Sequence, residues 1–429
     1  MANVLPGRRP RRSDPSRVSK LELRGVNTVS LEAVDSLLNT WRPGKRDHGR
    51  EIQVLDFFSG CGGMSLGFSA VAQKFGRYRL VGAIDINLNP LASYQRNFGV
   101  ATALADVRQL ANKKGELEKV LGSLENYDAE RPTVVIGCAP CQGFSGHRKK
   151  SWNRIDKRND LVAAFARVAL ELRPVCVVME NVPELLSQRY WRHFEEFKRL
   201  LHGGGYTVKA AIQNAAEFGA PQERFRAVVI AMKRTDFGLP EPFVCSTDFR
   251  TVRDAIGKLP RVAPGQQSPS DPLHRSANHR ESTIRVIESV PLDGGSRPPG
   301  IGPPCLDRVK GFYDVYGRLH WDRPAITVTH YARNPASGRF VHPEQNRGLT
   351  MREAARLQGF PDSFKFEGGF DQVFRQIGEA VPPHMSTCTA LAVLNNLDRG
   401  GSKLTTDLIT SPVSNSYGSV IAAMKMRRA

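Results

Sequence analysis

The side chains best suited to covalent chemistry lie in the segment GCAPCQGFSGHRKKSWNRIDKRND, residues 137–160. The apolar run TVVI comes directly before it, so Cys141 is expected beyond the carboxyl end of a buried strand, where α/β sheets bind their ligands. Pro140 before the cysteine and Gly143 after it would shape a turn that presents the thiol. Because a thiolate is a strong nucleophile near neutral pH, the segment favours Cys141 as an attacking group.

Other interpretations of this cysteine stay open. Cys141 is alternatively a buried structural residue, or one half of a Cys138–Cys141 pair that binds metal or forms a redox couple. A zinc site is disfavoured because no second pair of Cys or His appears at ligand spacing. A redox pair is disfavoured because it needs a thioredoxin-sized βαβ context, which a chain of 429 residues does not resemble.

A basic stretch follows the cysteine. Its charged or titratable side chains surround Trp152 and are His147, Arg148, Lys149, Lys150, Arg154, Lys157 and Arg158. A loop of this composition is suited to closing over a phosphate backbone. The alternative is an ordinary solvated loop.

A second candidate site begins at DFFSGCGG, residues 56–63, where a strand-like run enters a glycine-rich turn and a helix-like segment. Such glycines let the backbone approach a ligand at a helix N-terminus. The spacing is GxGG rather than the GxGxxG of dinucleotide sites. Asp85 and Asp106 each end a later short strand, where a carboxylate can accept the hydroxyls of a ribose. Each feature alone is also typical of a turn, but together they favour an adenosine-containing ligand.

Charged side chains also accompany two further apolar runs. Glu180 and Asn181 end one run, and the glutamate is either a desolvated acid that shares a proton with a ligand or a helix-capping carboxylate. Arg224 and Arg226 enter the run RAVVIAM at alternate positions, so we expect both to point to one side. Two guanidiniums on one face of a cleft suit an anionic or carbonyl-bearing ligand.

An α/β scaffold would bring these residues together. From Glu51, short β-branched runs alternate with helix-like stretches, which predicts a doubly wound, Rossmann-like sheet. That alternation stops near Thr235. The predicted parts of the chain are a basic, partly disordered extension (1–50), a main α/β domain (51–234), a smaller domain (235–370) with a loop-rich region at about 235–320, a segment returning to the main domain (371–397) and a polar tail (398–429). Within the extension, the run VNTVSLEAVDSLLNTW predicts a short accessory element.

Composition narrows the class of protein. The 61 Lys and Arg against 42 Asp and Glu give a formal charge of +19, which attracts nucleic acid but would equally suit a membrane surface or a ribosome. No stretch approaches the roughly 20 apolar residues of a membrane span, and the basic start lacks the apolar core of a secretory signal. Seven scattered cysteines do not suit a disulfide framework. We therefore expect a cytoplasmic protein.

The order DFFSGCGG, APCQGFS, ENVPELL, PQERFR resembles the DNA (cytosine-5)-methyltransferase family, because four separated motifs occur in that family's order. Three later segments, RPAITVTH (323–330), HPEQNRGLTMREAARLQGFPD (342–362) and IGEAVPPHMS (377–386), resemble its remaining motifs. The resemblance covers roughly Glu51 to Leu397. The dissimilar region at 235–320 falls where the family carries its target-recognition domain.

This resemblance implies transfer of a methyl group from S-adenosylmethionine, without a metal, to carbon-5 of a cytosine flipped out of a specific double-stranded DNA sequence. It implies a cofactor pocket lined by Phe58, Gly60, Gly62, Gly63, Asp85 (ribose), Asp106 (adenine amino group) and Ala380. It implies catalytic roles for Pro140 and Cys141 (the nucleophile turn, with Cys141 bonding to carbon-6), Gln142 (filling the space of the displaced base), Glu180 (engaging cytosine), and Arg224 and Arg226 (supporting substrate and nucleophile).

Two positions depart from the family pattern. Glu379 stands where the last motif usually has asparagine, which changes the hydrogen bonds beside the cofactor. Phe57 stands where leucine is usual, a change of shape without a change of polarity.

Two rival functions remain in view. An RNA cytosine methyltransferase would typically have threonine after the phenylalanine of the nucleophile motif, where this chain has Ser145. A non-catalytic DNA-binding relative would not need Cys141 or Glu180, yet both are present. We expect a monomer that binds DNA of the nucleoid, either solitary or within a restriction-modification system whose endonuclease acts separately. The candidates for base recognition are Arg250, Arg253, Arg275 and Arg280.

Overall fold

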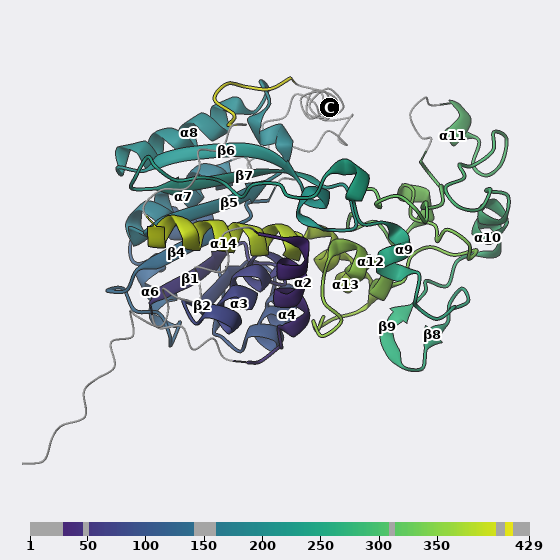
Figure 1. Cartoon of the computed structure of the whole chain (residues 1–429), viewed down its shortest axis with the longest axis horizontal. Coiled ribbons are helices and arrows are strands. Elements are labelled where there is room, and N and C mark those ends of the chain that lie inside the picture. Colours follow the sequence, from purple (N-terminus) through teal and green to yellow (C-terminus); the bar gives the residue numbers. More distant parts are fainter. Residues whose placement is uncertain (1–28, 46–50, 141–159, 309–313, 400–407, 415–429) are drawn as a thin grey trace, which may run out of the picture.

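Seven strands in the described part of the chain form one mixed sheet, the frame of the larger lobe (Figure 1). The computed structural model describes residues 29–45, 51–140, 160–308, 314–399 and 408–414. The strands are β1 (Ile52–Phe57), β2 (Tyr78–Asp85), β3 (Thr102–Leu104), β4 (Thr133–Gly137), β5 (Cys176–Asn181), β6 (Thr207–Asn214) and β7 (Phe225–Met232). Their order in the sheet is β3-β2-β1-β4-β5-β7-β6. The predicted doubly wound α/β fold is confirmed.

The direction of the strands explains their composition. Strands β1 to β5 pair in parallel, whereas β7 runs antiparallel to both β5 and β6. The central strands β1, β4 and β5 are buried along their whole length. Helices cover both faces of such a sheet, so its strands read as nearly continuous apolar runs. Their carboxyl ends meet at one edge, and the candidate residues lie there.

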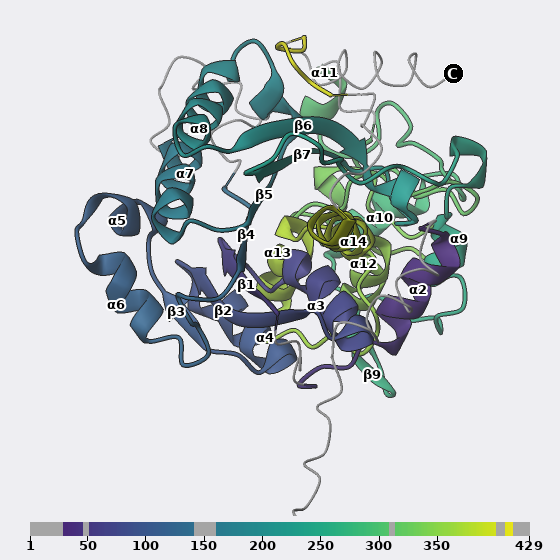
Figure 2. The same cartoon turned by 60° about the vertical axis from the view of Figure 1, so that its left-hand side comes forward.

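Helices cover the two faces separately (Figure 2). One face carries α2 (Leu31–Thr40), α3 (Gly63–Phe75), α4 (Leu88–Phe98) and α14 (Pro383–Arg399). The other carries α5 (Val107–Asn112), α6 (Glu116–Gly122), α7 (Leu161–Leu172) and α8 (Trp191–Gly203). Adjacent residues of one strand feed different cores: Val54 packs on the first face and Leu55 on the second. Among the described helices, none has the length and apolarity needed to cross a bilayer.

Helix α14 brings residues 383–399 back to the start of the sheet (Figure 1). Ser386 on α14 accepts a hydrogen bond from the Gly67 N–H on α3 (3.1 Å) and donates one to the Gly63 carbonyl (3.1 Å). The backbones approach so closely because Gly67 has no side chain. The larger lobe is therefore assembled from two parts that are distant in the sequence. The residues of the small lobe come between these two parts in the chain.

Helix α2 belongs to the core, although the sequence indicated only an accessory element. Val34, Leu37 and Leu38 are buried against the larger lobe. Trp41, at the end of the helix, is also buried, and its indole N–H donates to the Ser69 hydroxyl at 3.0 Å. Burial of an aromatic ring with its polar atom satisfied is strongly stabilising. Residues 1–28 and 46–50 of the extension predicted to be partly disordered (1–50) lie outside the described residues.

The small lobe has little regular structure, consistent with its Pro and Gly content. Its elements are α9 (Val252–Ile256), β8 (Gln267–Ser268), β9 (Asp271–Arg275), α10 (Glu281–Glu288), α11 (Cys305–Arg308), α12 (Met351–Gln358) and α13 (Phe370–Glu379). Short 3-10 turns complete the described chain at Pro183–Leu186, Ala215–Phe218, Ser246–Asp248 and Pro335–Ser337. The predicted domain limits themselves stay a prediction.

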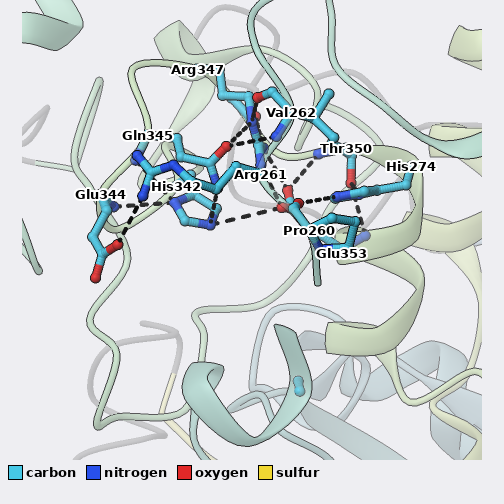
Figure 3. A network of polar contacts seen from close by, with 12 residues as sticks. Pro260, Arg261, Val262, His274, His342, Glu344, Gln345, Arg347, Thr350 and Glu353 are labelled. Carbon is cyan, nitrogen blue, oxygen red and sulfur yellow. Dashed lines mark hydrogen bonds and ion pairs between the residues drawn. The ribbon is translucent and has the colours of Figure 1, made fainter. Parts of the chain in front are cut away.

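A buried polar network holds the small lobe together (Figure 3). Both Glu353 carboxylate oxygens bind the Arg347 guanidinium at 2.7 Å, and one also accepts the Thr350 N–H at 2.8 Å. Burial alone would raise the pKa of Glu353, but the charge and hydrogen bonds of Arg347 outweigh it and lower the pKa to about 2. Thr350 in turn hydrogen-bonds His274 on β9 at 3.0 Å. These ion-paired and hydrogen-bonded side chains lie beside apolar residues of the small lobe, such as Leu349 and Met351, that belong to the first core.

The contact of α3 with α14 predicts a sharp difference between two glycines. A Cβ at Gly67 would lie 2.3 Å from backbone atoms of Ser386 and Thr387, so we expect Gly67→Ala to lower the free energy of unfolding by about 2–3 kcal/mol. Gly122 on α6 has open space around its Cβ position, so Gly122→Ala should change stability by less than about 1 kcal/mol. Urea unfolding of the two variants checks this, and equal stabilities would refute the close α3–α14 packing.

Candidate active site

The glycine-rich turn joins β1 to α3 in a conformation that ordinary side chains rarely adopt. Phe58, Gly60 and Gly62 all have positive φ angles, 54°, 52° and 95°. A Cβ at Gly62 would lie 2.3 Å from the Phe98 ring, and one at Gly63 would lie 2.6 Å from the Val381 carbonyl oxygen. At Gly60, by contrast, no atom of the described residues other than its chain neighbours lies within 4 Å of the Cβ position. The turn is packed underneath and open at Gly60, as a backbone cradle for a ligand would be.

The N-terminus of α3 offers backbone donors at this cradle. Its N-cap is Gly62, which has no side chain to satisfy the first free N–H groups of the helix. Such groups favour an anionic or strongly polar ligand atom. Phe58 is buried and packs edge-on against Phe165, with ring centroids 6.0 Å apart. Its left-handed backbone is unfavourable for a bulky residue, which is common where a site fixes the chain.

Asp85 ends β2 beside the turn, where the sequence predicted it. One carboxylate oxygen accepts the Gly60 N–H at 2.9 Å, and the other accepts the Asn87 N–H at 2.9 Å. Burial raises the pKa of Asp85, while these backbone donors and, more weakly, the charge of Arg375 oppose the shift. The carboxylate therefore fixes the turn and stands at its edge.

Asp106 lies directly after β3, and its carboxylate already accepts hydrogen bonds from Arg108. It caps α5, and its carboxylate accepts hydrogen bonds from the Arg108 backbone (2.9 Å) and guanidinium (3.0 Å). Burial opposes ionisation of Asp106, but the contacts with Arg108 outweigh it and lower its pKa. The role in binding an adenine amino group stays a prediction, and it requires an oxygen lone pair beyond those that Arg108 uses.

An exposed apolar rim surrounds Asp85, and sequence reasoning missed it. Ile86, Leu88 and Leu104 have exposed fractions of 61%, 64% and 55%, although large apolar side chains are usually buried. Leu104 pairs with Asp85 across β3 and β2, so the rim lies at the carboxyl ends of these two strands. A clustered apolar rim beside a carboxylate suits a flat, partly polar ring. The signal was visible in the sequence as apolar residues directly after Asp85.

A buried carboxylate beneath the turn is a second feature that the sequence analysis did not single out. Asp56 accepts a 2.6 Å hydrogen bond from Ser65 at one oxygen, and the other has no partner among the described residues. Burial raises the pKa of Asp56 to about 8, the Ser65 hydrogen bond opposes this, and the charge of Asp85 adds to it. An unsatisfied buried oxygen at a ligand cradle is an expected mark of a functional site.

The nucleophile segment is only partly described. Cys141 and Gln142 lie outside the described residues, so their placement stays a prediction. Pro140 is the last described residue before them and is half-buried. The Asn181 side-chain amide donates to the Ala139 carbonyl at 3.1 Å, and the Cys138 N–H donates to the Phe57 carbonyl at 3.3 Å. The end of β4 is thereby fixed to β1 and β5, directly before the predicted nucleophile.

Glu180 and Arg226 form an ion pair at the same sheet edge. The Arg226 Nε lies 2.7 Å from the Glu180 Oε1, and both side chains are about one-tenth exposed. Glu180 pairs with Val228 across β5 and β7, so it shares a sheet face with Arg226, two residues earlier on β7. The same neighbourhood holds Asn181 and the end of β4. An acid and a guanidinium therefore meet beside the predicted nucleophile turn.

Arg224 does not share this arrangement, in contrast to the expectation that both arginines point to one side. It precedes β7, so strand alternation does not extend to it. Its guanidinium is buried and donates to the Val328 carbonyl (2.8 Å) and the Gly378 carbonyl (3.0 Å). Arg224 thus connects the start of β7 to the segments that contain Val328 and Gly378, whereas Arg226 faces Glu180. A supporting role for Arg224 is consistent with these contacts.

The end of α13 lies against the glycine-rich turn. The Cβ of Ala380 would be 2.9 Å from a Cβ at Gly63, and the Cys61 thiol lies 3.7 Å from the Gln376 carbonyl oxygen. Glu379, the departure from the family pattern, binds the Arg375 guanidinium one helical turn earlier at 3.1 Å. The predicted Ala380 and Gly63 are therefore neighbours, although 317 positions separate them in the chain.

The four arginines suggested for base recognition have different surroundings. Arg250 forms an ion pair with Asp35 on α2, and Arg253 binds Asp322 at 2.7 Å while its guanidinium lies 5.2 Å from the Trp321 ring centroid. Arg275 lies 5.6 Å from the Phe370 ring centroid, and Arg280 is the N-cap of α10. Which of them contacts DNA stays a prediction. Among the described residues, no three His, Cys, Asp or Glu side chains are grouped for a metal ion.

Comparison with known proteins matches this chain to a protein family. The model of the family described as C-5 cytosine-specific DNA methylase matches residues 52–394. The chain is 32% identical over 361 residues to the Type II methylase M.HgiDII of Herpetosiphon aurantiacus, covering 80% of this chain and 96% of that protein. It is 35% identical over 346 residues to the Type II methyltransferase M1.HphI of Haemophilus parahaemolyticus, covering 80% and 87%.

A solved structure shares the fold. It is described as a DNA modification methyltransferase encoded within an Escherichia coli prophage, and it aligns with a TM-score of 0.62 at 24% identity, covering 81% of this chain and all of that one. At this identity the likeness concerns the fold alone.

Arg224 and Arg226 should contribute differently to the free energy of unfolding. A lysine ammonium is compact and lacks the planar guanidinium whose two terminal nitrogens reach the Val328 and Gly378 carbonyls, so we expect Arg224→Lys to lower the free energy of unfolding by about 2–3 kcal/mol. Arg226→Lys keeps a positive charge beside the buried Glu180 carboxylate, so the free energy of unfolding should fall by only about 1 kcal/mol. Denaturant unfolding of both variants measures the difference in their free energies of unfolding. If Arg224→Lys is as stable as Arg226→Lys, Arg224 does not hold the Val328 and Gly378 segments as described.

Proposed function

The chain belongs to the C-5 cytosine-specific DNA methylase family, and on that premise we propose that Cys141 carries out methylation of a flipped-out cytosine through a covalent bond to the base. The enzyme is a DNA (cytosine-5-)-methyltransferase, and its family and fold imply S-adenosylmethionine as the methyl donor. The observation that carries the mechanism is the Glu180–Arg226 ion pair beside the end of β4.

The residues of the glycine-rich turn fit the proposed donor. Gly60 leaves open space, the N-terminus of α3 has no side-chain cap, and one oxygen of Asp56 lacks a partner among the described residues. Asp85 would hold the ribose hydroxyls, and the exposed apolar side chains beside it would cover the adenine ring. Phe58, Asp106 and Ala380 complete the proposed pocket. When bound, the donor supplies an electrophilic methyl group on a sulfonium sulfur.

Cys141 supplies the electron density that cytosine lacks. Carbon-5 of the ring is a poor nucleophile, but a Cys141 thiolate that bonds to carbon-6 pushes electrons toward it. Carbon-5 then takes the methyl group, and the Cys141 bond remains until a base removes the carbon-5 proton and the thiolate leaves. The hydrogen bond from Asn181 to the Ala139 carbonyl supports this role because it fixes the chain two residues before the nucleophile. Pro140 then sets the turn.

Glu180 and Arg226 are proposed to bind the polar edge of the pyrimidine. As electrons move toward N3, that atom needs a proton or a hydrogen bond, which Glu180 is proposed to supply. Arg226 is proposed to bind the oxygen on carbon-2, where a guanidinium can donate without losing its contact with Glu180. Their pairing at 2.7 Å in a largely buried position keeps both side chains oriented before substrate enters. Arg224 is proposed to support substrate and nucleophile indirectly, by holding the Val328 and Gly378 carbonyls at the start of β7.

The substrate is proposed to be a specific sequence in double-stranded DNA. A target carbon inside the base stack is out of reach, so the nucleotide must rotate out at a cost of a few kcal/mol. The formal charge of +19 favours phosphate contacts that offset this cost. Gln142 is proposed to fill the vacated space, and side chains at about 235–320 to select the base. We propose a monomer acting on nucleoid DNA in the cytoplasm, as the methylating member of a restriction-modification system or alone.

The covalent step can be tested directly. Duplex DNA carrying 5-fluorocytosine has no removable proton at carbon-5, so the wild-type protein should remain bonded to it while Cys141→Ala forms no adduct. Denaturing electrophoresis and peptide mass spectrometry identify the bonded residue, and bisulfite sequencing of DNA from expressing cells reports the methylated sequence. Cys138→Ala is the matched control, which should still form the adduct. Methylation that proceeds without an adduct through residue 141 would overturn the mechanism, and label transferred to RNA instead of DNA would favour the rival substrate.

Glu180→Gln should separate catalysis from binding. The amide keeps the shape of the side chain but cannot share a proton with N3, so we expect turnover to fall by about 10²- to 10⁴-fold. DNA affinity should change by less than about tenfold because the phosphate contacts are unaffected. Single-turnover methylation and gel-shift titration measure the two quantities. A Glu196→Gln variant, which alters a partly exposed glutamate of α8 that pairs with Arg167, is the control; an unchanged rate in Glu180→Gln would remove Glu180 from the mechanism.

A further inference from the structure

A short segment beyond the residues that match the family packs against the larger lobe (Figure 2). The family match ends at residue 394, and the segment 408–414, LITSPVS, lies within the predicted polar tail. Leu408, Ile409 and Val413 are nevertheless half-buried. Leu408 packs on the core at one face of the sheet, whereas Ile409 and Val413 pack on the core at the other face. Residues 408–414, called the strap below, therefore lie along an edge of the sheet.

Backbone hydrogen bonds attach the strap at two points. The Ile409 N–H donates to the Ala210 carbonyl of β6 at 2.8 Å. The Val413 N–H donates to the Leu186 carbonyl at 2.9 Å, and the Gln188 N–H donates to the Val413 carbonyl at 3.0 Å. Val413 thereby forms a parallel bridge directly after the 3-10 turn that follows β5. The strap connects the edge strand β6 to the chain that leaves β5.

The two attachment points enclose the strands that carry the Glu180–Arg226 pair. The strand order β5-β7-β6 places β7, with Arg226, between the point on β6 and the point after β5. Glu180 is the next-to-last residue of β5, and the 3-10 turn that the strap contacts begins at Pro183. A contact with this turn is therefore a contact with the backbone that immediately follows Glu180.

The backbone around Glu180 has less support from β4 than the rest of its strand. Pairing of β5 with β4 ends at Met179, and beyond it the contact with that side is the Asn181 side-chain amide on the Ala139 carbonyl. Pairing with β7, by contrast, continues through Asn181. The following turn is closed by the Leu185 N–H, which donates to the Val182 carbonyl at 3.1 Å. The strap adds a further attachment to this turn.

We propose that the strap positions Glu180 for its contact with cytosine by fixing the turn after β5 to the edge strand β6. The inference rests on the proposed function, because the strap gains this role only if Glu180 acts on the base. No strap residue touches a reacting atom, so its effect on the rate comes through Glu180. Displacement of a catalytic group by about 1 Å costs up to about 10²-fold in rate. A strap that only shielded the edge of β6 from other chains would not affect Glu180.

A proline at position 413 tests this contact. Val413→Pro removes the N–H that the Leu186 carbonyl accepts and keeps an apolar side chain of similar size. Single-turnover methylation of duplex DNA at saturating S-adenosylmethionine should become about tenfold slower. The affinities for DNA, by gel shift, and for S-adenosylhomocysteine, by calorimetry, should each change by less than about twofold. Ser414→Pro is the matched control, since the Ser414 N–H has no acceptor among the described residues, and its rate should equal that of the wild type.

A double-mutant cycle separates positioning of Glu180 from general stabilisation. Added to Glu180→Gln, Val413→Pro should slow methylation by less than about twofold, because the proton-sharing group that the strap positions is already absent. A weakened fold would slow both backgrounds by the same factor. If Val413→Pro no longer binds S-adenosylhomocysteine, Val413→Ala takes its place in the cycle; it trims the packed side chain and should slow the Glu180 background by about threefold.

The outcomes distinguish the inference from the proposed function. A wild-type rate in the Val413 variants, or an equal loss with Glu180 and with Gln at position 180, overturns the inference and leaves the proposed function standing. A wild-type rate in Glu180→Gln alone overturns the proposed role of Glu180, and the inference with it.

Discussion

The Arg224 guanidinium joins three segments that lie far apart in the sequence. It lies directly before β7 and donates hydrogen bonds to the carbonyls of Val328 and Gly378, the second of which belongs to α13. A buried guanidinium requires acceptors, so these segments must meet there for the charge to be tolerated. The same β7 carries Arg226 opposite Glu180, and the same α13 ends at the glycine-rich turn. One buried cation thereby couples the proposed base-binding pair to the cofactor cradle.

The fold was predictable where local pattern and tertiary environment agree. The runs at β1, β2, β4, β5 and β7 are apolar on both faces, as a covered sheet requires, and they were readable directly. The strand β6 was not singled out, because Lys209 and Gln213 interrupt its apolar run; both side chains donate to backbone carbonyls of the segment after β7. The antiparallel direction of β7 was equally hidden, since strand direction depends on pairing and not on composition. Helix α2 was underrated because its few apolar residues gain their importance from packing on α3.

In the candidate site, too, some residues could be predicted from the sequence and others could not. Asp85, Glu180 and the glycines were predictable because their residue types are constrained by chemistry at a strand end. The different partners of Arg224 and Arg226 were not, since these partners come from residues more than 100 positions away or from a neighbouring strand. The Arg375–Glu379 pair was half visible: the sequence revealed the substitution, and only the helix geometry revealed its counter-charge. Asp56 was concealed within an apolar run, where its unpaired oxygen could not be foreseen.

The return of α14 to α3 also governs when the molecule matures. During synthesis the sheet emerges from the ribosome long before residues 383–399, so one face of the nascent larger lobe carries only α2, α3 and α4 until α14 is made. Contacts between such distant segments close slowly, because the loop they enclose is long. The small lobe, whose polar network involves residues 260–353, can form within that interval. Chains that stop short of α14 would therefore lack the contacts that Ser386 makes with Gly63 and Gly67 beside the glycine-rich turn.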